Sequence, residues 1–242
     1  MNYVVTVVRD FSMYEKCIKA NPRLGRFCLE AIDNRADNTP IPVLYNRFID
    51  KLNSMDDGWV VFCHEDFEIT NDLASLLQRC DKNVLYGAIG GVRRGLLGFG
   101  MQVVYGNMLE TKKSDFSRKW QPGKAIANPI LVEAFDCCCM IVHSFLIRKY
   151  GLRFDEALEF DLYVEDFCAN ARVKYGIKSV VLPFSCCHHS GSVGSERLNR
   201  HLPYLRDKYP RNCFVGTIAY FGTPNWQKRL QDFMVNALRK CK

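Results

Sequence analysis

Three polar clusters in this 242-residue chain combine the residue types that hold metal ions and move protons. They are Asp33-Asn34, His64-Glu65-Asp66 and Glu165-Asp166. The first two follow expected strands, and the third lies at the start of an expected helix. Strand ends converge on one crevice in an open α/β sheet, so we expect these clusters to meet around one ligand.

A divalent cation would give the carboxylates of these clusters a reason to gather. Mg²⁺ and Mn²⁺ prefer carboxylate and diphosphate oxygens, and such an ion neutralises the charge that builds on a departing diphosphate. Asp66 is the best candidate ligand, because it follows a nearly continuous apolar run from Trp59 to Cys63. The alternative is that Asp66 is a solvated acid at a strand end, or the N-cap of the next helix.

The order of the expected elements indicates how these residues are positioned. Apolar runs predict strands at residues 3–8, 27–32, 59–63, 84–89, 130–142 and 180–182. Helical periodicity is expected at residues 14–18, 43–52, 71–80, 144–150 and 164–175. The stretch 93–127 has little clear period and is expected to be a long irregular excursion. The sequence therefore predicts a single-domain α/β fold with a mainly parallel central sheet flanked by helices.

Composition and charge narrow the class of partner. The chain has 33 Lys and Arg residues against 26 Asp and Glu residues, which gives a net charge of +7 and favours an anionic partner. No nucleic-acid-binding signature accompanies the basic residues, so we expect a phosphorylated substrate and no nucleic acid. Arg93, Arg94 and Lys124 could contact phosphate or an anionic acceptor.

The twelve cysteines are expected to be reduced. Residues 1–10 show no basic leader, apolar core or cleavage site, so we expect a cytoplasmic protein rather than a secreted one. No apolar run approaches the roughly 20 residues that a membrane span requires, so membrane contact would be peripheral at the inner face.

Segments spread over residues 3 to 194 resemble, in their order, the glycosyltransferase A fold, specifically inverting family-two-like glycosyltransferases. The segments of the first half are Val4 to Val8, similar to the first nucleotide-binding strand; Asp33-Asn34, the base-contacting turn; Leu44-Tyr45-Asn46, the helix beneath the nucleotide; and Val61 to Asp66, the strand ending in an Asp-x-Asp signature. His64 stands in place of the first aspartate of that signature.

The second half carries the rest of the resemblance. Its segments are Val132 to Asp136 followed by Cys137 to Val142, similar to the acceptor-side strand; Phe154-Asp155-Glu156 and Phe160 to Asp166, similar to the segment that leads to a Glu-Asp pair; and His188-His189-Ser190-Gly191-Ser192, similar to the late histidine and closing loop.

This resemblance implies a transferase that moves a sugar from a nucleotide diphosphate donor, a UDP-sugar, to a hydroxyl of a glycan or lipid-linked glycan with inversion. Asp66 and His188 would hold Mn²⁺ or Mg²⁺, Asp166 would be the general base, and Glu165 would orient the acceptor. Asp136 would bind the acceptor. The residues implied in binding the nucleotide-sugar are Val8, Asp33, Asn34, Asn46, His64 and Glu65.

Other interpretations remain for the same residues. The substitution at His64 makes a catalytically inactive nucleotide- or sugar-binding domain on the same fold an alternative. The pair Glu165-Asp166 can simply place charge at a helix N-terminus. His188 and His189 can form a polar turn, and consecutive ligands in Cys186-Cys187-His188-His189 do not match the separated pairs of structural zinc sites. A thiol redox protein is disfavoured because no Cys-x-x-Cys pair is present.

Two regions divide the chain. Residues 1–220 are expected to form the catalytic domain, and residues 221–242 an amphipathic helix packed on it. The apolar stripe of that helix is Trp226, Leu230, Phe233, Met234 and Leu238. Peripheral membrane contact through this helix would suit a lipid-linked acceptor.

Overall fold

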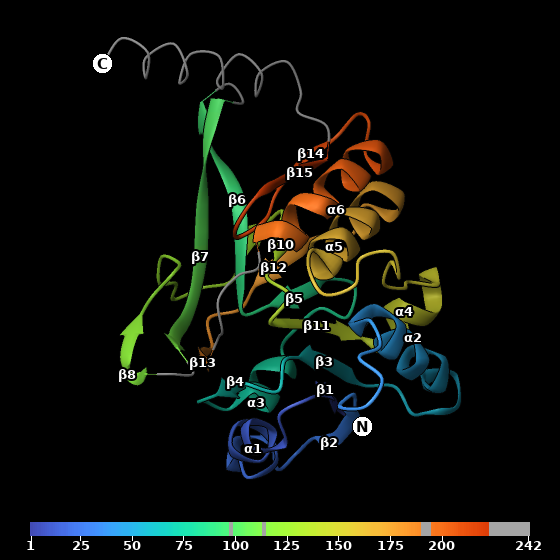
Figure 1. Ribbon diagram of the computed structural model, residues 1–242, viewed down its shortest axis with the longest axis vertical. Coiled ribbons are helices and arrows are strands. Elements are labelled where there is room, and N and C mark those ends of the chain that lie inside the picture. The colour runs from blue at the N-terminus through green and yellow to red at the C-terminus, as the bar shows by residue number, and fades with distance from the viewer. Residues whose placement is uncertain (97–98, 113–114, 190–194, 223–242) are drawn as a thin grey trace.

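A seven-stranded mixed sheet forms the centre of the structure, a computed structural model that describes residues 1–96, 99–112, 115–189 and 195–222. The strands, in spatial order, are β2 (Cys28–Asp33), β1 (Tyr3–Val8), β3 (Trp59–Cys63), β11 (Cys139–His143), β5 (Leu85–Gly87), β12 (Ser179–Val181) and β9 (Ile130–Val132) (Figure 1). The pairs β2–β1, β1–β3 and β5–β12 are parallel, and the other three are antiparallel.

This sheet differs from the mainly parallel one predicted. The strand β11 runs antiparallel between β3 and β5 and so divides the parallel strands into two groups. An apolar run does not encode strand direction, because a buried strand is apolar on both faces whichever way its neighbours run. The order and the type of the first elements follow the prediction, including strands at 3–8 and 59–63.

Helices cover both faces of the sheet because strand side chains alternate. In β1, Val5 and Val7 join one core cluster while Val4 and Val8 join the other. On the first side pack α2 (Ile41–Lys51), α4 (Ser144–Tyr150) and α5 (Tyr163–Tyr175). On the second side pack α1 (Phe11–Tyr14), its π-helical continuation η1 (Glu15–Lys19), and α3 (Leu73–Leu77). Two short 3₁₀ turns, η2 (Pro22–Leu24) and η3 (Leu52–Ser54), complete this part.

A second sheet occupies the stretch predicted to be irregular. It contains β10 (Ala134–Phe135), β6 (Ile89–Leu96), β7 (Phe99–Lys112), β13 (Ser185–His188) and β4 (Phe67–Ile69), and β8 (Asp115–Trp120) pairs with β7. The prediction for residues 93–127 is therefore wrong over β6, β7 and β8. Glycines at 90, 91, 95, 100 and 106 interrupt the alternation, and the β6–β7 pairing, not local pattern, makes these segments strands.

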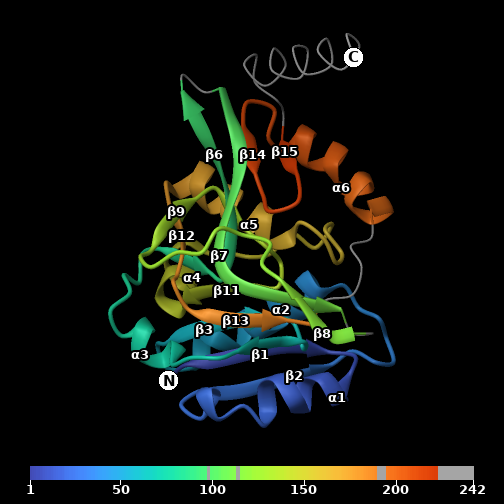
Figure 2. The same ribbon diagram turned by 90° about the vertical axis from the view of Figure 1, so that its left-hand side faces the viewer.

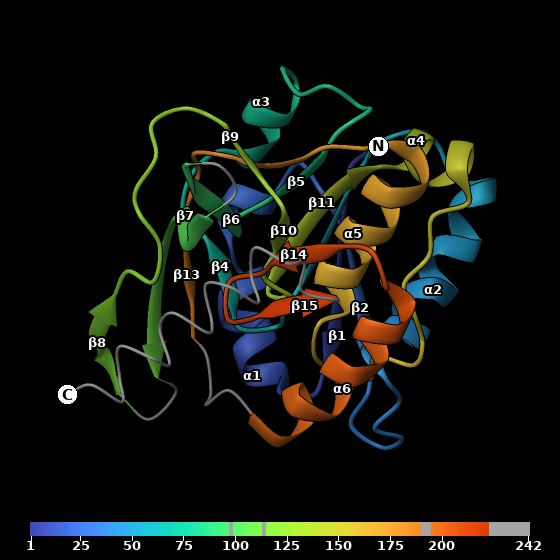
Figure 3. The same cartoon turned by 90° about the horizontal axis from the view of Figure 1, so that it is seen from above.

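The C-terminal described part lies against α5. The helix α6 (Ser195–Lys208) and the hairpin of β14 (Cys213–Val215) and β15 (Tyr220–Gly222) lie beside α5 (Figure 3). No helix within the described ranges has the length and apolarity needed to cross a membrane. All cysteines within these ranges are free. The predicted closing loop at Ser190 to Ser192 and residues 223–242 of the predicted helix at 221–242 lie outside the described residues. Residues 221 and 222 end the strand β15, so the helix prediction is wrong there.

Candidate functional site

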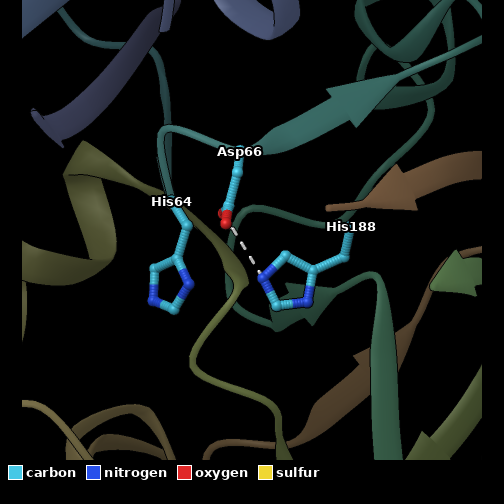
Figure 4. A group of neighbouring side chains, drawn as sticks. All are labelled: His64, Asp66 and His188. Atoms are coloured by element: carbon cyan, nitrogen blue, oxygen red, sulfur yellow. Dashed lines mark ion pairs between the residues drawn. The ribbon is translucent and has the colours of Figure 1, made fainter. Parts of the chain in front are cut away.

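Three side chains predicted to bind the metal or the nucleotide meet at one point. His64 and Asp66 follow β3, and His188 ends β13. One ligand atom from each lies within 4.8 Å of the others, and Nε2 of His188 lies 3.4 Å from Oδ1 of Asp66 (Figure 4). Asp66 and His188 are buried. This arrangement is a candidate metal centre.

Strand register explains why residues 66 and 188 become neighbours. β13 pairs with β4 so that His188 lies opposite Phe67, the residue after Asp66. The backbone N–H of His189 then donates to the carbonyl of Asp66 at 2.9 Å. The sequence predicts both residues as ligands, but it does not predict the strand pairing that brings them together.

A tyrosine fixes the ring of His64. Nε2 of His64 lies 3.0 Å from the hydroxyl of Tyr163, and that hydroxyl donates to the carbonyl of Cys137 at 3.1 Å. Since the hydroxyl proton is used on Cys137, the hydroxyl accepts the proton of Nε2–H. In this tautomer Nδ1 of His64 is the nitrogen that would coordinate a metal ion, and Figure 4 shows it on the side of His188.

A second carboxylate stands behind His188. Nδ1 of His188 is buried without a hydrogen-bond partner and lies 3.7 Å from Oε1 of Glu110, on β7. Burial lowers the pKa of His188, but the carboxylates of Asp66, Glu110 and Asp136 outweigh burial and raise its pKa to about 9. Two imidazoles and one carboxylate fit a divalent cation, which His188 would bind through Nε2 after releasing its proton.

A cavity of about 160 Å³ adjoins this centre. It is lined by Val7, Arg9, Asn34, Ile41, Tyr45, His64, Glu65, Asp66 and Phe160. It therefore lies beside the carboxyl ends of the parallel strands β1 and β3, the edge at which open α/β sheets bind ligands. Three residues predicted to bind the nucleotide-sugar line it, namely Asn34, His64 and Glu65.

Other predicted nucleotide-binding residues lie elsewhere. Val8 packs in the core on the opposite side of β1 from Val7, so the strand alternation places its neighbour in the cavity. Asp33 is exposed and forms an ion pair with Arg35. The amide of Asn46 donates to the carbonyl of Phe154 at 2.9 Å and accepts its N–H at 3.0 Å. This reciprocal bond ties α2 to the segment before α5.

Two of the cavity residues also hold the loops around it. Glu65 accepts the backbone N–H groups of Arg9 and Asp10, the latter at 2.9 Å. Asn34 exchanges two hydrogen bonds of 2.8 Å with the backbone of Thr39. The loops after β1 and β2 are thus fixed by side chains that face the cavity.

Asp136, predicted to bind the acceptor, lies near the candidate metal centre. Its Oδ1 accepts the N–H of Cys138 at 3.0 Å, and its Oδ2 accepts the hydroxyl of Thr217 at 2.7 Å. Burial would raise the pKa of Asp136, but the positive charge of His188, the Thr217 and Cys138 bonds and His64 hold it below its usual value. Asp136 is therefore an ionised carboxylate beside the two histidines.

The consecutive acids at the start of α5 face different partners. Glu165 accepts the thiol of Cys137 at 3.0 Å, and burial and the nearby charge of Asp136 raise its pKa to about 8. Asp166 forms a buried ion pair with Lys208, 2.8 Å from Nζ to Oδ1, and accepts the hydroxyl of Tyr209 at 2.7 Å. Helical residues in sequence point about 100° apart, so one faces Asp136 and the other faces α6.

His189 links two strands beside the candidate metal centre through its side chain. Nε2 of His189 lies 3.1 Å from Glu68 on β4, and Nδ1 lies 2.7 Å from the hydroxyl of Thr111 on β7. These contacts join the strand after Asp66 to the strand that carries Glu110. The sequence does not predict Tyr163, Glu110 and Thr217 as part of the site. Each reaches the site through strand or helix packing, which no local sequence pattern indicates.

Comparisons with known proteins give structural likeness only. No family model matches the sequence, and no curated protein matches it. A crystal structure of residues 1–349 of TarS from S. aureus is similar with a TM-score of 0.45 and 11% identity, over 86% of this chain and 73% of that one.

Two further structures give similar values. The same TarS fragment in complex with UDP has a TM-score of 0.43 and 11% identity, over 83% of this chain and 63% of that one. A glycosyltransferase involved in glycosylating the major capsid of PBCV-1 has a TM-score of 0.38 and 10% identity, over 82% of this chain and 97% of that one. Likeness at this level assigns no activity to the chain.

Proposed function

We propose that this chain is a metal-dependent glycosyltransferase that moves a sugar from a nucleotide diphosphate donor to a glycan hydroxyl with inversion. The observation that carries the proposal is the meeting of His64, Asp66 and His188 beside a cavity at the ends of β1 and β3. That cavity suits part of a nucleotide, and the adjoining ligand set suits a diphosphate-bound cation. The choice of a UDP-sugar rests on the sequence resemblance.

The chain's own residues would hold the cation and keep it oriented. His64, Asp66 and His188 would be the ligands, with the Tyr163 hydroxyl fixing the ring of His64 and the Glu110 carboxylate 3.7 Å from Nδ1 of His188. Two nitrogen ligands favour Mn²⁺ over Mg²⁺. When bound, the cation would neutralise the negative charge of the leaving diphosphate.

The proton acceptor is proposed to be Glu165. The acceptor O–H passes its proton to this carboxylate while the oxygen forms a bond to the anomeric carbon. The bond from that carbon to the donor diphosphate breaks, and its electron pair leaves with the nucleoside diphosphate. Glu165 faces Asp136 near the histidines, whereas Asp166 is held by Lys208 and Tyr209. Asp166 as the base stays a prediction, and the two are separable by mutation.

Thermal unfolding with nucleotides tests the proposal. UDP at about 100 times its dissociation constant is expected to add about 2.7 kcal/mol, or about 5–10 °C in Tm for a chain of this size, when Mn²⁺ is present. ADP, GDP and CDP serve as matched ligands with the same diphosphate. If no nucleoside diphosphate raises Tm more with Mn²⁺ than without it, the proposal fails.

A binding domain without transfer activity is the second candidate. The burial of Asp166 in an ion pair under α6 favours it, because the carboxylate predicted as the base is occupied. This candidate predicts the same Mn²⁺-dependent rise in Tm with UDP. It predicts no transfer from any UDP-sugar to a glycan, and no UDP release above that of a heat-inactivated sample.

A further inference from the structure

A second and larger hollow lies on the other side of the Asp136 region. It measures about 620 Å³, within the size range of ligand sites, and is open to solvent at Met101, which is 74% exposed. Its lining residues are Met101, Gln102, Val103, Val104, Gln121, Pro122, Gly123, Lys124 and Thr217, and we call it the β7 groove.

One turn borders both the β7 groove and the proposed reaction centre. The turn at Gly216 and Thr217 joins β14 to β15, and Figure 2 shows that hairpin beside the β6–β7 ribbon. Nε2 of Gln102, on β7, donates to the carbonyls of Gly216 and Thr217 at 2.7 and 2.8 Å. The ribbon thus holds the turn in place from the groove side.

The opposite side of that turn touches both carboxylates of the centre. The Thr217 hydroxyl donates to Asp136 at 2.7 Å. A Cβ on Gly216 would lie 3.2 Å from Cγ of Glu165, so the backbone of this turn packs directly against that side chain. A ligand in the β7 groove that contacts Thr217 is therefore one residue away from Asp136, and Gly216, which precedes Thr217, packs against Glu165.

The lining chemistry favours a sugar chain. Gln102, Gln121 and Thr217 offer side-chain oxygens that can accept hydrogen bonds, while Val103 and Val104 offer apolar surface. Their own donor groups bond within the protein, to Gly216, Gly106 and Asp136. Sugars present hydroxyls at the ring edge and C–H groups on the ring face, so this mixture suits them. Lys124 is the one cationic residue among the described lining residues, which suits a polyphosphate poorly.

We propose that the β7 groove binds the acceptor glycan and that Thr217 positions Asp136 against it, an inference that rests on the proposed transferase function. The glycan lies along β7 and the 121–124 segment, and its reactive end reaches the turn at Gly216 and Thr217. The donor occupies the separate cavity at β1 and β3. Donor and acceptor then approach Asp136 and Glu165 from opposite sides.

Binding to an array of immobilised neutral and acidic oligosaccharides tests this site. Val103→Trp fills the groove and is expected to lower glycan binding by about 10-fold or more, because the indole clashes with the ligand. Gln121→Trp does the same from an exposed residue, where misfolding is not expected. Leu131→Trp, on the exposed face of the edge strand β9, is the matched control and should bind as the wild type does.

Separate readouts distinguish this proposal from the function on which it rests. The rise in Tm with UDP and Mn²⁺ should be unchanged in Gln121→Trp and Leu131→Trp. If both groove variants bind the glycan as strongly as the wild type does, the proposal for the β7 groove is wrong. It is also wrong if the wild type binds UDP and Mn²⁺ but no arrayed glycan. If the wild type binds glycan but not UDP, and the groove variants lose glycan binding, the glycan site is supported and the donor proposal is wrong. A wild-type protein that binds neither UDP nor any arrayed glycan overturns both proposals.

Discussion

Asp66→Ala is expected to lower the affinity for Mn²⁺ by at least about 100-fold and to abolish the effect of Mn²⁺ on UDP binding. Asp66 supplies the single carboxylate among the three grouped donors, and its Oδ1 lies 3.4 Å from Nε2 of His188. Loss of a residue that only orients a ligand already weakens metal binding by about 10- to 100-fold, so loss of a ligand should do more. Titration calorimetry with MnCl₂ measures the change.

The matched control is Asp50→Ala, which removes an exposed aspartate paired with Arg153. This variant should bind Mn²⁺ as the wild type does, because surface ion pairs contribute little and Asp50 lies outside the centre. Unchanged Mn²⁺ affinity in a folded Asp66→Ala protein would exclude Asp66 as a ligand. The backbone carbonyl of Asp66, which accepts from His189, remains in the variant, so the strand pairing should survive.

Glu165→Gln is expected to lower transfer by about 100- to 10,000-fold while UDP and Mn²⁺ still bind, as loss of a general base does. The amide keeps the shape of the side chain and its place beside Cys137 but cannot take a proton.

Asp166→Asn should act mainly on stability. The substitution removes the charge of Asp166 from a buried ion pair and is expected to lower the free energy of unfolding. The loss should lie at the lower end of about 3 to 5 kcal/mol, because Asp155 still pairs with Lys208.

The pH dependence of transfer gives this assignment a second readout. Burial and the charge of Asp136 raise the pKa of Glu165 to about 8, so the ionised form that accepts a proton increases with pH up to that value. The ratio kcat/KM should therefore rise about tenfold per pH unit below the pKa and level off above about pH 8. A folded Asp166→Asn protein without transfer, alongside an active Glu165→Gln protein, would return the role of base to Asp166.

Much of the first half of the fold could be predicted because its signals are local. The apolar runs at β1 and β3 match the observed strands residue for residue, and the polar residues after β3 do lie at the edge of a cavity. The resemblance predicts Asp66 and His188 as ligands of one metal ion, and the structure places the two side chains side by side. The structure adds the β4–β13 pairing that brings them together.

Non-local pairing accounts for what the sequence did not reveal. The ribbon of β6 and β7 owes its strands to each other, since its glycine-rich stretches carry little strand preference alone. Tyr163 is a buried helical aromatic by pattern, and only its hydroxyl contact with His64 marks it as part of the centre. The periodicity of a segment predicts its secondary structure, but it does not predict which residue of a distant segment packs against it.

Side-chain direction at element ends was the other missing information. Val7 rather than Val8 faces the cavity, and Glu165 rather than Asp166 faces Asp136. In both cases the two residues are consecutive in one segment, and a step of one residue changes the face of the strand or helix that is presented. Such a choice depends on the orientation of the strand or helix, which tertiary packing sets.

Anomalous scattering from crystals grown with UDP and Mn²⁺ is the most direct test of the proposed centre. A manganese peak is expected within coordination distance of Nδ1 of His64, the carboxylate of Asp66 and Nε2 of His188, with the diphosphate of UDP on its open side. UDP bound without manganese at these three residues, or manganese bound at another group of side chains, would contradict the proposed metal-dependent donor site.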